Sequence, residues 1–510
     1  MPAGLSEYLT IEYLMMAENG NWGRDWAGWA LDTAAQRGAD YADVRVVSER
    51  HRAVSTKNGK AGTVADSDTL GVGIRVVVDG AWGFAATDRL TRAAIDQTAA
   101  HAVAIARASA SVSARRRLRL APVEAYRAVW VSPCAQDPFA VPVDQNLALL
   151  LAVDKELRAV EGVTLAEAEM VFRRTRQLFC STLGSEIDQT RVVSGAGYTA
   201  TSFGDNEIQR RSYPNSFGGQ FQLQGYELIP RLRLAENARR VGEEAVALHR
   251  AAQCPQMTGT VILDSSQLGL QIHESIGHPI ELDRVLGTEA NFAGMSFLTL
   301  DQLGHLRYGS DLVNVVADAT LDHGPGLGTF AFDDEGVPAQ RTDIIRRGQF
   351  VGYISSRETA PEIGQAASNG CMRAESWNRL PLIRMTNISI VPGDQPLSPE
   401  ELIADTDQGV YMETNRSWSI DDKRYHFQFG CEAGWEIRHG KRTRLLKNPS
   451  YSGITTEFWN SMDAICSRDQ WTLWGTPNCG KGQPQQVMGT GHGAAPARFR
   501  NVKIGTAYQK

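Results

Sequence analysis

Hydrophobic and polar residues follow patterns that divide the chain into three stretches. In the first, the pattern predicts a helix, a strand, a β-rich pair of runs and a long alanine-rich helix: residues 25–37, 41–47, 69–87 and 89–108. The first helix should stop at Gly38. Asp79 and Gly80 join the two β-rich runs, and this dipeptide favours a tight hairpin turn. Residues 1–122 are therefore interpreted as a small N-terminal α/β domain.

The second and third stretches differ in their balance of helix and strand. Residues 123–254 begin with a predicted helix and continue as short β-like runs closed by another helix: residues 144–161, 163–228 and 230–252. This order indicates an antiparallel meander with helices, ending at Cys254-Pro255. Residues 255–510 are rich in glycine, short strands and turn signals. The predicted class is α+β, with a large strand-rich C-terminal domain.

Composition places the chain among ordinary globular proteins. It has 510 residues, of which 42% are hydrophobic and 22% charged, enough for two or three domains with full cores. The net charge of -6 gives no reason to expect a nucleic-acid partner. Residues 108–122 carry four arginines, which could form a nucleic-acid arm, but the acidic total favours a solvated linker or surface strand.

Targeting signals and cysteine usage indicate a cytoplasmic protein. The first twenty residues lack the basic start and unbroken apolar run of a signal peptide. No apolar stretch reaches about 18 residues, so no membrane span is expected. The seven cysteines are odd in number and scattered, which does not suit a disulfide framework. A reducing compartment is expected, in which most of these thiols are small buried groups.

The stretch HESIGHP, from His273 to Pro279, is the first candidate for chemistry. It has the zinc-protease pattern H-E-x-x-H with one residue too many between the histidines. The preceding run VILD is a predicted strand, and Ser265 or Ser266 is placed to cap a helix that follows it. His273 would then lie on the second turn of that helix.

The extra residue changes the geometry of the motif. On an ideal helix His273 and His278 would lie roughly 140° apart, too far round for both to reach one metal ion. Gly277 weakens a helix, and Pro279 clashes with the carbonyl of Ser275. A π-type turn, or a helix that ends at Gly277, would return His278 to the side of His273. The motif thus predicts a metal site on a distorted helix, unless the two histidines are a chance pair on the surface.

A third ligand must come from elsewhere, because catalytic zinc sites have three protein ligands and an open position. Cys479 lies in a segment dense with Gly and Pro, interpreted as a loop that approaches a site closely. Lys481, two residues on, would help a thiolate to hold its charge. The alternative is a plain buried thiol. The nearby GTGHG is not followed by a helical run, so it is not interpreted as a phosphate-binding loop.

These motifs together resemble the TldD/PmbA family of metallopeptidases. The segments that carry the resemblance are GADYADVRVV (38–47), DPF (137–139), HESIGHPIELD (273–283), FAFDDEGVPAQR (330–341) and NCGKGQP (478–484). The resemblance covers most of the chain and is to the TldD-like branch, because the PmbA-like branch lacks the histidine motif. One departure is Pro279, which stands where the family would have glycine.

The resemblance implies a site and an activity. His273, His278 and Cys479 would bind zinc, and Glu274 would be the catalytic base of a zinc metallopeptidase. Relatives act on short or unfolded peptides, some processing peptide precursors or degrading antitoxins, in a chamber closed by a dimer. A homodimer or a heterodimer with a PmbA-like subunit is therefore expected.

Other acidic residues near these motifs have two interpretations each. Glu281 could hold a histidine tautomer from behind, or it could be a solvated carboxylate at a helix end, which is slightly favoured. Asp333, Asp334 and Glu335 could bind calcium, but a turn with capped amides suits them better.

Two further functions stay open on the sequence. The chain could be a non-catalytic peptide-binding partner, although the intact histidine motif and Cys479 argue against this. It could also be a cysteine hydrolase in which Cys479 is the nucleophile, and this would need a nearby histidine such as His492.

Overall fold

The computed structural model describes residues 21–112, 118–204, 206–292 and 294–505. The first twenty residues and three of the four arginines in the basic run, Arg115, Arg116 and Arg117, lie outside these ranges. Among the described residues no helix combines the length and the apolar character that a membrane crossing requires. The chain is α+β, as the hydrophobic pattern predicts.

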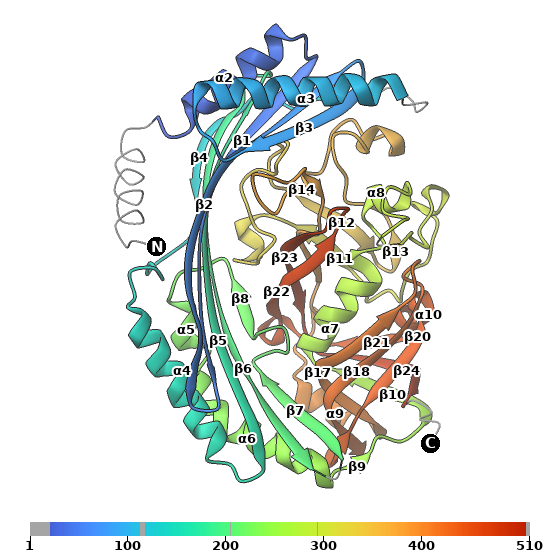
Figure 1. The fold of residues 1–510 in the computed structure, drawn as a ribbon. Coiled ribbons are helices and arrows are strands. Elements are labelled where there is room, and N and C mark those ends of the chain that lie inside the picture. The colour runs from blue at the N-terminus through green and yellow to red at the C-terminus, as the bar shows by residue number, and fades with distance from the viewer. Residues whose placement is uncertain (1–20, 113–117, 205, 293, 506–510) are drawn as a thin grey trace.

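The first half of the chain forms one curved sheet of eight strands (Figure 1). The order is β3-β2-β1-β5-β6-β4, and β7 and β8 also pair with β6. The strands are β1 (Tyr41–Lys57), β2 (Lys60–Val78), β3 (Ala81–Thr87), β4 (Arg127–Val131), β5 (Val163–Ser181), β6 (Glu186–Gly204), β7 (Glu207–Tyr213) and β8 (Gln220–Gln222). Strands from both sides of residue 122 thus share a sheet, and the domain boundary there stays a prediction.

The hairpin predicted at Asp79-Gly80 is confirmed. Both residues have positive φ, 52° and 74°, as a two-residue type I′ turn requires. Val78 pairs with Ala81 directly across the turn.

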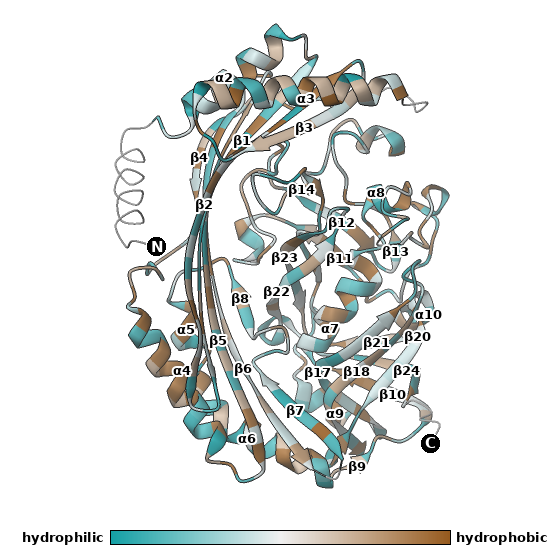
Figure 2. Cartoon of the chain, viewed as in Figure 1, coloured by the Kyte–Doolittle hydropathy of each residue, from teal (hydrophilic) through white to brown (hydrophobic). Residues whose placement is uncertain are grey.

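Among the described residues, five helices accompany this sheet. They are α2 (Arg24–Gln36), α3 (Arg92–Val112), α4 (Val143–Arg158), α5 (Leu228–Arg231) and α6 (Leu234–Arg250). The buried residues of α3, among them Ile95, Ala99 and Ala106, recur at helical spacing and form one stripe. A Cβ on Gly83 of β3 would lie 2.1 Å from the carbonyl oxygen of Ala102, so glycine allows α3 to pack closely. Figure 2 shows hydrophobic and hydrophilic bands along α4 and α6, as expected of helices with one face on a sheet.

The C-terminal half contains a closed barrel and a second sheet. Because β17 pairs with both β10 and β18, the strands β17-β10-β24-β20-β18 form a ring. The strands of this sheet are β9 (Ala252–Gln253), β10 (Met257–Leu263), β17 (Gln408–Ile420), β18 (His426–Arg438), β19 (Lys441–Lys447), β20 (Ser450–Ile454), β21 (Met462–Ile465) and β24 (Ala497–Ile504).

The second sheet has the order β13-β12-β11-β16-β23-β22. Its strands are β11 (Val315–Asp318), β12 (Arg341–Arg346), β13 (Gln349–Phe350), β16 (Asn387–Ile390), β22 (Thr472–Lys481) and β23 (Gln486–Ala494), and a separate pair is β14 (Met372–Arg373) with β15 (Leu382–Ile383). The short helices are α7 (Ser265–Ile272), α8 (Leu282–Val285), α9 (Pro399–Ala404) and α10 (Thr455–Asn460). α7 packs against β17 of the barrel and against β16 and β23, so it lies between the two sheets.

The curved sheet partly encloses the C-terminal half on its concave side (Figure 1). Buried polar contacts fix this arrangement. The Gln177 amide donates to Asp334 at 2.7 Å, and the Ser212 hydroxyl donates to Glu432 at 2.7 Å. Buried polar groups stay paired because an unpaired one would lose its bond to water. The enclosure thus depends on specific partners as well as on hydrophobic packing.

The acidic cluster at 333–335 belongs to this contact, and the predicted turn is confirmed. Asp333 accepts hydrogen bonds from the backbone amides of Glu335 and Val337, both at 2.9 Å. Glu335 pairs with Arg75 of β2 at 3.2 Å, and Asp334 accepts from the amide of Ala374. The three carboxylates are therefore occupied by amides and cations of the chain itself.

Candidate metal centre

The helix that carries the histidine motif begins one residue earlier than the sequence suggested. Asp264, directly after β10, is the N-cap, and its carboxylate accepts from the amides of Ser266 at 2.9 Å and Gln267 at 3.0 Å. The prediction that Ser265 or Ser266 is the cap is wrong. A carboxylate with two oxygens can hold two free amides at once and also favours the positive end of the helix dipole.

The predicted π-type turn is confirmed at the motif itself. Residues His273–Gly277 form one π-helical turn, and the amide of His278 donates to the carbonyl of His273 at 3.1 Å, five residues back. This wider turn brings the two imidazoles to the same side. Their ring centroids are 4.8 Å apart, with the rings nearly perpendicular. The extra residue in the motif is absorbed by the backbone without separating the histidines.

The surroundings satisfy the groups that this turn leaves without helical partners. Pro279 has no amide hydrogen for the carbonyl of Ser275, and the hydroxyl of Tyr308 donates to that carbonyl instead. The Ser275 hydroxyl donates to the Gln271 carbonyl at 2.6 Å and accepts from the Trp459 indole at 3.0 Å. A Cβ on Gly277 would lie 2.1 Å from the sulfur of Met385, so a larger residue there would force the Met385 side chain to move.

Replacing Tyr308 by phenylalanine should test how far the turn depends on this hydroxyl. The variant leaves a buried carbonyl unpaired, and we expect a loss of about 1–3 kcal/mol in the free energy of unfolding, measured by urea titration. Metal affinity should fall with it, because the carbonyl belongs to the turn between the two histidines. Tyr353→Phe is the matched control, since the Tyr353 hydroxyl donates to the carbonyl of Thr299 at 2.9 Å, outside the motif. Equal metal affinities in the two variants would show that the Tyr308 hydroxyl does not stabilise the turn that holds the two histidines.

Cys479 joins the two histidines, but from a strand. The interpretation of its segment as a loop is wrong, because β22 pairs with β23 through Cys479 and Met488, with a register shift between Thr476 and Cys479. The Gly-rich composition reflects close packing of strands here, as at Gly475, where a Cβ would lie 2.1 Å from the carbonyl oxygen of Phe221.

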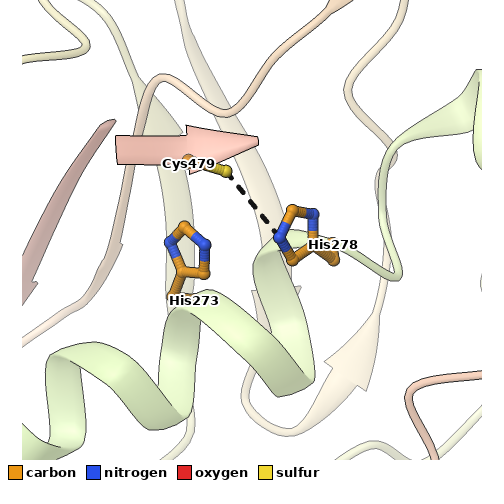
Figure 3. A group of neighbouring side chains, drawn as sticks. All are labelled: His273, His278 and Cys479. Atoms are coloured by element: carbon orange, nitrogen blue, oxygen red, sulfur yellow. Dashed lines mark hydrogen bonds between the residues drawn. The ribbon is translucent and has the colours of Figure 1, made fainter. Parts of the chain in front are cut away.

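The three side chains form a compact, buried group (Figure 3). The sulfur of Cys479 lies 3.8 Å from Nε2 of His278, and one candidate ligand atom from each of the three residues lies within 4.8 Å of the others. Two imidazole nitrogens and a thiolate are a donor set that zinc prefers, with room for a fourth ligand. The geometry therefore fits a metal ion held by His273, His278 and Cys479.

Hydrogen bonds behind the histidines select the tautomer that a metal ligand needs. His492 of β23 donates from Nδ1 to the Ile388 carbonyl at 3.1 Å. Burial, reinforced by His273, holds the pKa of His492 well below its usual value, so the ring is neutral and its Nε2 is an acceptor. Nδ1 of His273 lies 2.7 Å from this nitrogen and must be the donor. Nε2 of His273 is thereby left unprotonated and able to bind a metal.

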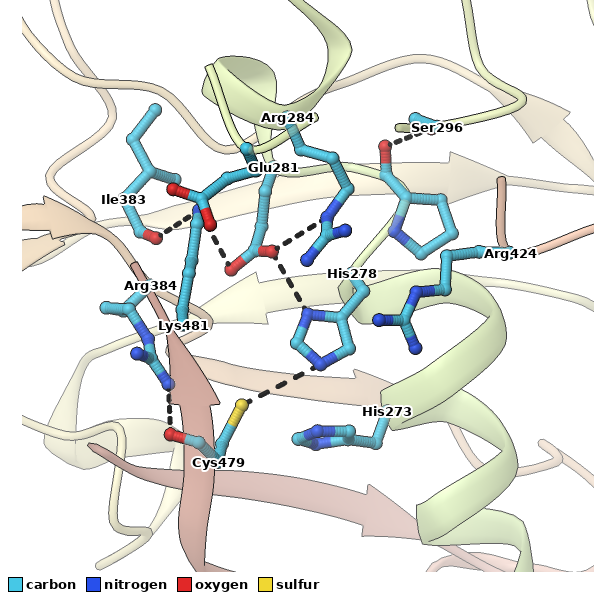
Figure 4. A network of polar contacts seen from close by, with 12 residues as sticks. His273, His278, Glu281, Arg284, Ser296, Ile383, Arg384, Arg424, Cys479 and Lys481 are labelled. Atoms are coloured by element: carbon cyan, nitrogen blue, oxygen red, sulfur yellow. Dashed lines mark hydrogen bonds and ion pairs between the residues drawn. The ribbon is translucent and has the colours of Figure 1, made fainter. Parts of the chain in front are cut away.

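Glu281 performs the same task for His278, and the interpretation of it as a solvated carboxylate is wrong. It is fully buried and lies 3.0 Å from Nδ1 of His278 (Figure 4). Lys481 and Arg284 each lie 3.4 Å from its carboxylate. Burial alone would raise the pKa of Glu281, but these cations and His278 hold it well below the usual range. The charged carboxylate fixes the Nδ1–H tautomer of His278 and leaves Nε2 facing Cys479.

The charge on Cys479 is supported by a residue that the sequence did not indicate. Burial would raise the pKa of this thiol, but Arg384 and His278 outweigh it and lower the pKa below its usual value. Arg384 also donates to the Cys479 carbonyl. Lys481 was predicted to stabilise the thiolate, but its ammonium pairs instead with Asp283 at 2.8 Å and with Glu281.

Glu274 lies beside the ligands with a partner of its own. Its carboxylate accepts from Nη1 of Arg424 at 2.6 Å, and Glu274 is only 5% exposed. Arg424 lies between β17 and β18, 150 residues further along the chain. The carboxylate is thus held in a charged hydrogen bond next to the histidine pair.

Comparison with known proteins identifies the family. A model of the PmbA/TldA metallopeptidase C-terminal domain matches residues 256–506, and a model of PmbA/TldA metallopeptidase domain 1 matches residues 42–106, together more than half of the chain. The chain belongs to the TldD/PmbA metallopeptidase family. The resemblance inferred from the motifs is confirmed.

Individual members of the TldD/PmbA family are similar to this chain over between about half and nearly all of its length. A metalloprotease of Methanothermobacter thermautotrophicus is 28% identical, covering 91% of this chain and 95% of its own. A zinc metalloprotease TldD homolog of Saccharolobus solfataricus is 29% identical over 48% of this chain and 51% of its own. The crystal structure of TldE from Thermococcus kodakarensis shares the fold, with a TM-score of 0.69 at 14% identity, covering 93% of this chain and 99% of that one.

The structure thus brings together every residue that the TldD/PmbA motifs implied. His273, Glu274, His278 and Cys479 lie in one site, although their roles stay predictions. Residues with no sequence signal of their own, Arg384 and Arg424, complete its charge pattern.

Proposed function

We propose that this chain is a zinc-dependent peptidase that hydrolyses short or unfolded peptides. The observation that carries the proposal is the buried group of two imidazoles and the Cys479 thiol, whose pKa is lowered by Arg384 and His278, with the Glu274 carboxylate beside it. Relatives named metalloproteases, one of them a zinc metalloprotease, support the same conclusion. Zinc held by His273, His278 and Cys479 would supply an acidic water and polarise the substrate carbonyl.

Glu274 is proposed as the general base and acid. Its carboxylate would take a proton from the attacking water and return it to the leaving amine. Its place next to His273 in the sequence and the π turn keep it at the edge of the ligand group. Glu281 and His492 would keep the two imidazoles in the required tautomers throughout.

Burial of the site supports an unfolded substrate. His273, Glu274, His278 and Cys479 are each 4–5% exposed. A peptide bond within reach of these atoms must enter as an extended segment, because the surface of a compact domain cannot approach so closely. The strand-rich surroundings would let such a segment pair through its backbone, which gives loose sequence preference. Processing of peptide precursors and degradation of antitoxins both fit this substrate class.

We also propose how the chain assembles and where it is located. A dimer, either of this chain or with a PmbA-like subunit, is proposed from the family to which the chain belongs. The seven cysteines are free thiols, which suits the reducing cytoplasm.

The test is cleavage of an unstructured peptide by the purified chain, followed by mass spectrometry. We expect cleavage with zinc, loss of cleavage with a chelator, and recovery when zinc is restored. The same peptide sequence placed inside a stable folded domain should stay intact. The assay is run with the chain alone and with a PmbA-like chain added.

Failure of a zinc-loaded chain to cleave the peptide in either arm would favour the alternative, a non-catalytic peptide-binding subunit. His492 cannot act as the base of a cysteine hydrolase, because both of its nitrogens are occupied by Ile388 and His273. His278, whose Nε2 lies 3.8 Å from the thiol, is the histidine that this alternative would use, and cleavage that survives the chelator would favour it.

A further inference from the structure

Arg424 is a residue of the site to which the proposed function assigns no step beyond its pair with Glu274. It lies in the turn between β17 and β18 and has a positive φ of 64°. Its Nη1 donates to Glu274, while its Nε is buried without a hydrogen-bond partner. In Figure 4 its guanidinium points toward His278, from the side away from Lys481 and Arg384. A buried donor without an acceptor is costly, so the orientation calls for an explanation.

The turn that carries Arg424 is fixed on several sides. The Arg424 amide donates to the Asp421 carbonyl at 2.8 Å, and its own carbonyl accepts from the Thr455 hydroxyl at 2.9 Å. The Asp421 carboxylate caps the Tyr425 amide at 2.7 Å. The carbonyl of Lys423 accepts from the amide of Phe297 at 2.8 Å. The guanidinium is therefore presented by a rigid backbone, as a group that must be preorganised would be.

The other cations around the site are committed to different partners. Lys481 and Arg284 pair with Glu281, and Arg384 donates to the Cys479 carbonyl. Arg424 is paired with Glu274, the group that is proposed to gain a proton during the reaction. Once Glu274 is protonated, the positive charge of Arg424 is no longer balanced by a carboxylate.

We propose that Arg424 is a catalytic residue that donates a hydrogen bond to the carbonyl oxygen of the scissile peptide bond. This inference rests on the proposed peptidase function. The oxygen of water bonds to the carbonyl carbon, its proton passes to Glu274, and the π electron pair of the C=O bond moves onto the carbonyl oxygen. Arg424 then faces a new anion at the moment when its own carboxylate partner is neutralised.

The second half of the step restores the resting arrangement. The carbonyl re-forms, the C–N bond breaks with its electron pair on nitrogen, and Glu274 gives the proton to that nitrogen. Glu274 is again a carboxylate, and its pair with Arg424 returns. Arg424 exchanges no proton, and its contribution is electrostatic. A single donor of this kind is worth roughly 10²–10³ in kcat.

The experiment compares Arg424→Gln and Arg424→Lys with Lys423→Gln in zinc-loaded full-length protein. Lys423 is exposed and lies in the same turn, so its variant removes an equal charge without touching the site. We expect Arg424→Gln to lower kcat by roughly 10²–10³ with little change in KM, Arg424→Lys to lower it less, and Lys423→Gln to leave it unchanged.

A phosphinic peptide, which imitates the tetrahedral geometry, separates oxyanion binding from mere support of Glu274. Its inhibition constant should rise across the variants in step with the fall in kcat/KM, while the affinity for product peptides stays constant. Arg424→Gly offers a further check, because glycine suits the positive φ and added methylguanidinium should restore activity where urea does not.

Two results would overturn the inference. The first is an unchanged affinity of Arg424→Gln for the phosphinic peptide despite lost turnover, which would leave Arg424 only a support for Glu274. The second is a loss confined to substrates with a free C-terminal carboxylate and absent for peptide amides, which would make Arg424 a binder of chain ends. Failure of the unsubstituted protein to cleave any peptide would instead refute the peptidase function itself.

Discussion

Cys479→Ala should lose its metal, with metal affinity falling by more than the roughly 10–100-fold that removal of an outer partner costs. The variant lacks one of the three proposed metal ligands, and the lost ligand is the thiolate. His273→Ala and His278→Ala should behave in the same way. Elemental analysis after gel filtration measures the result, and the increase in Tm that zinc gives to the parent protein should be reduced.

The control for this experiment is Cys466→Ala. Cys466 is also fully buried in the C-terminal core but belongs to no group of candidate ligands. It should cost stability through its cavity and leave the zinc content unchanged. If Cys479→Ala binds zinc as tightly as the parent, the three-ligand assignment is wrong and Glu281 becomes the first candidate to complete the site.

Glu274→Gln should have the opposite signature, with zinc retained and turnover reduced by about 10²–10⁴-fold. Glutamine keeps the size of the side chain and can still accept a hydrogen bond from Arg424, but it cannot take a proton from water. Metal content and kcat measured on the same preparation decide the outcome. Loss of zinc from this variant would show that Glu274 supports the ligands, and full activity would remove it from the mechanism.

Local pattern was enough to predict the long helices, the Asp79-Gly80 hairpin and the class of the fold. α3 and α4 have one apolar stripe each, and the turn dipeptide has few other conformations available. The sharing of one sheet by strands on both sides of residue 122 depends on pairings such as β1 with β5. These join residues more than a hundred positions apart, so no local window contains them.

The same contrast holds within the site. The distorted turn between His273 and His278 could be predicted from the sequence, because Gly277 and Pro279 act on the backbone of that same turn. The strand at Cys479 was missed because glycine and proline in a sequence usually indicate loops, whereas here strands pack too closely for larger residues.

The roles of the supporting residues depend on contacts that only the fold creates. Arg424 and Arg384 have no neighbouring motif, and their importance follows from lying beside Glu274 and Cys479. For His492 a signal was present, a histidine among small residues. The sequence offered it only as a possible partner of Cys479, whereas in the structure its ring contacts His273.

The wider turn at the histidine motif also has a meaning for protein design. Inserting one residue into the H-E-x-x-H helix of another scaffold would not reproduce this centre. A transplant must carry the hydroxyl of Tyr308, the indole of Trp459 and Met385 packed against Gly277, and Tyr308, Trp459 and Met385 all lie far from the motif in sequence. What must be transplanted is thus the turn together with the residues packed around it, and the H-E-x-x-x-H sequence alone is not sufficient.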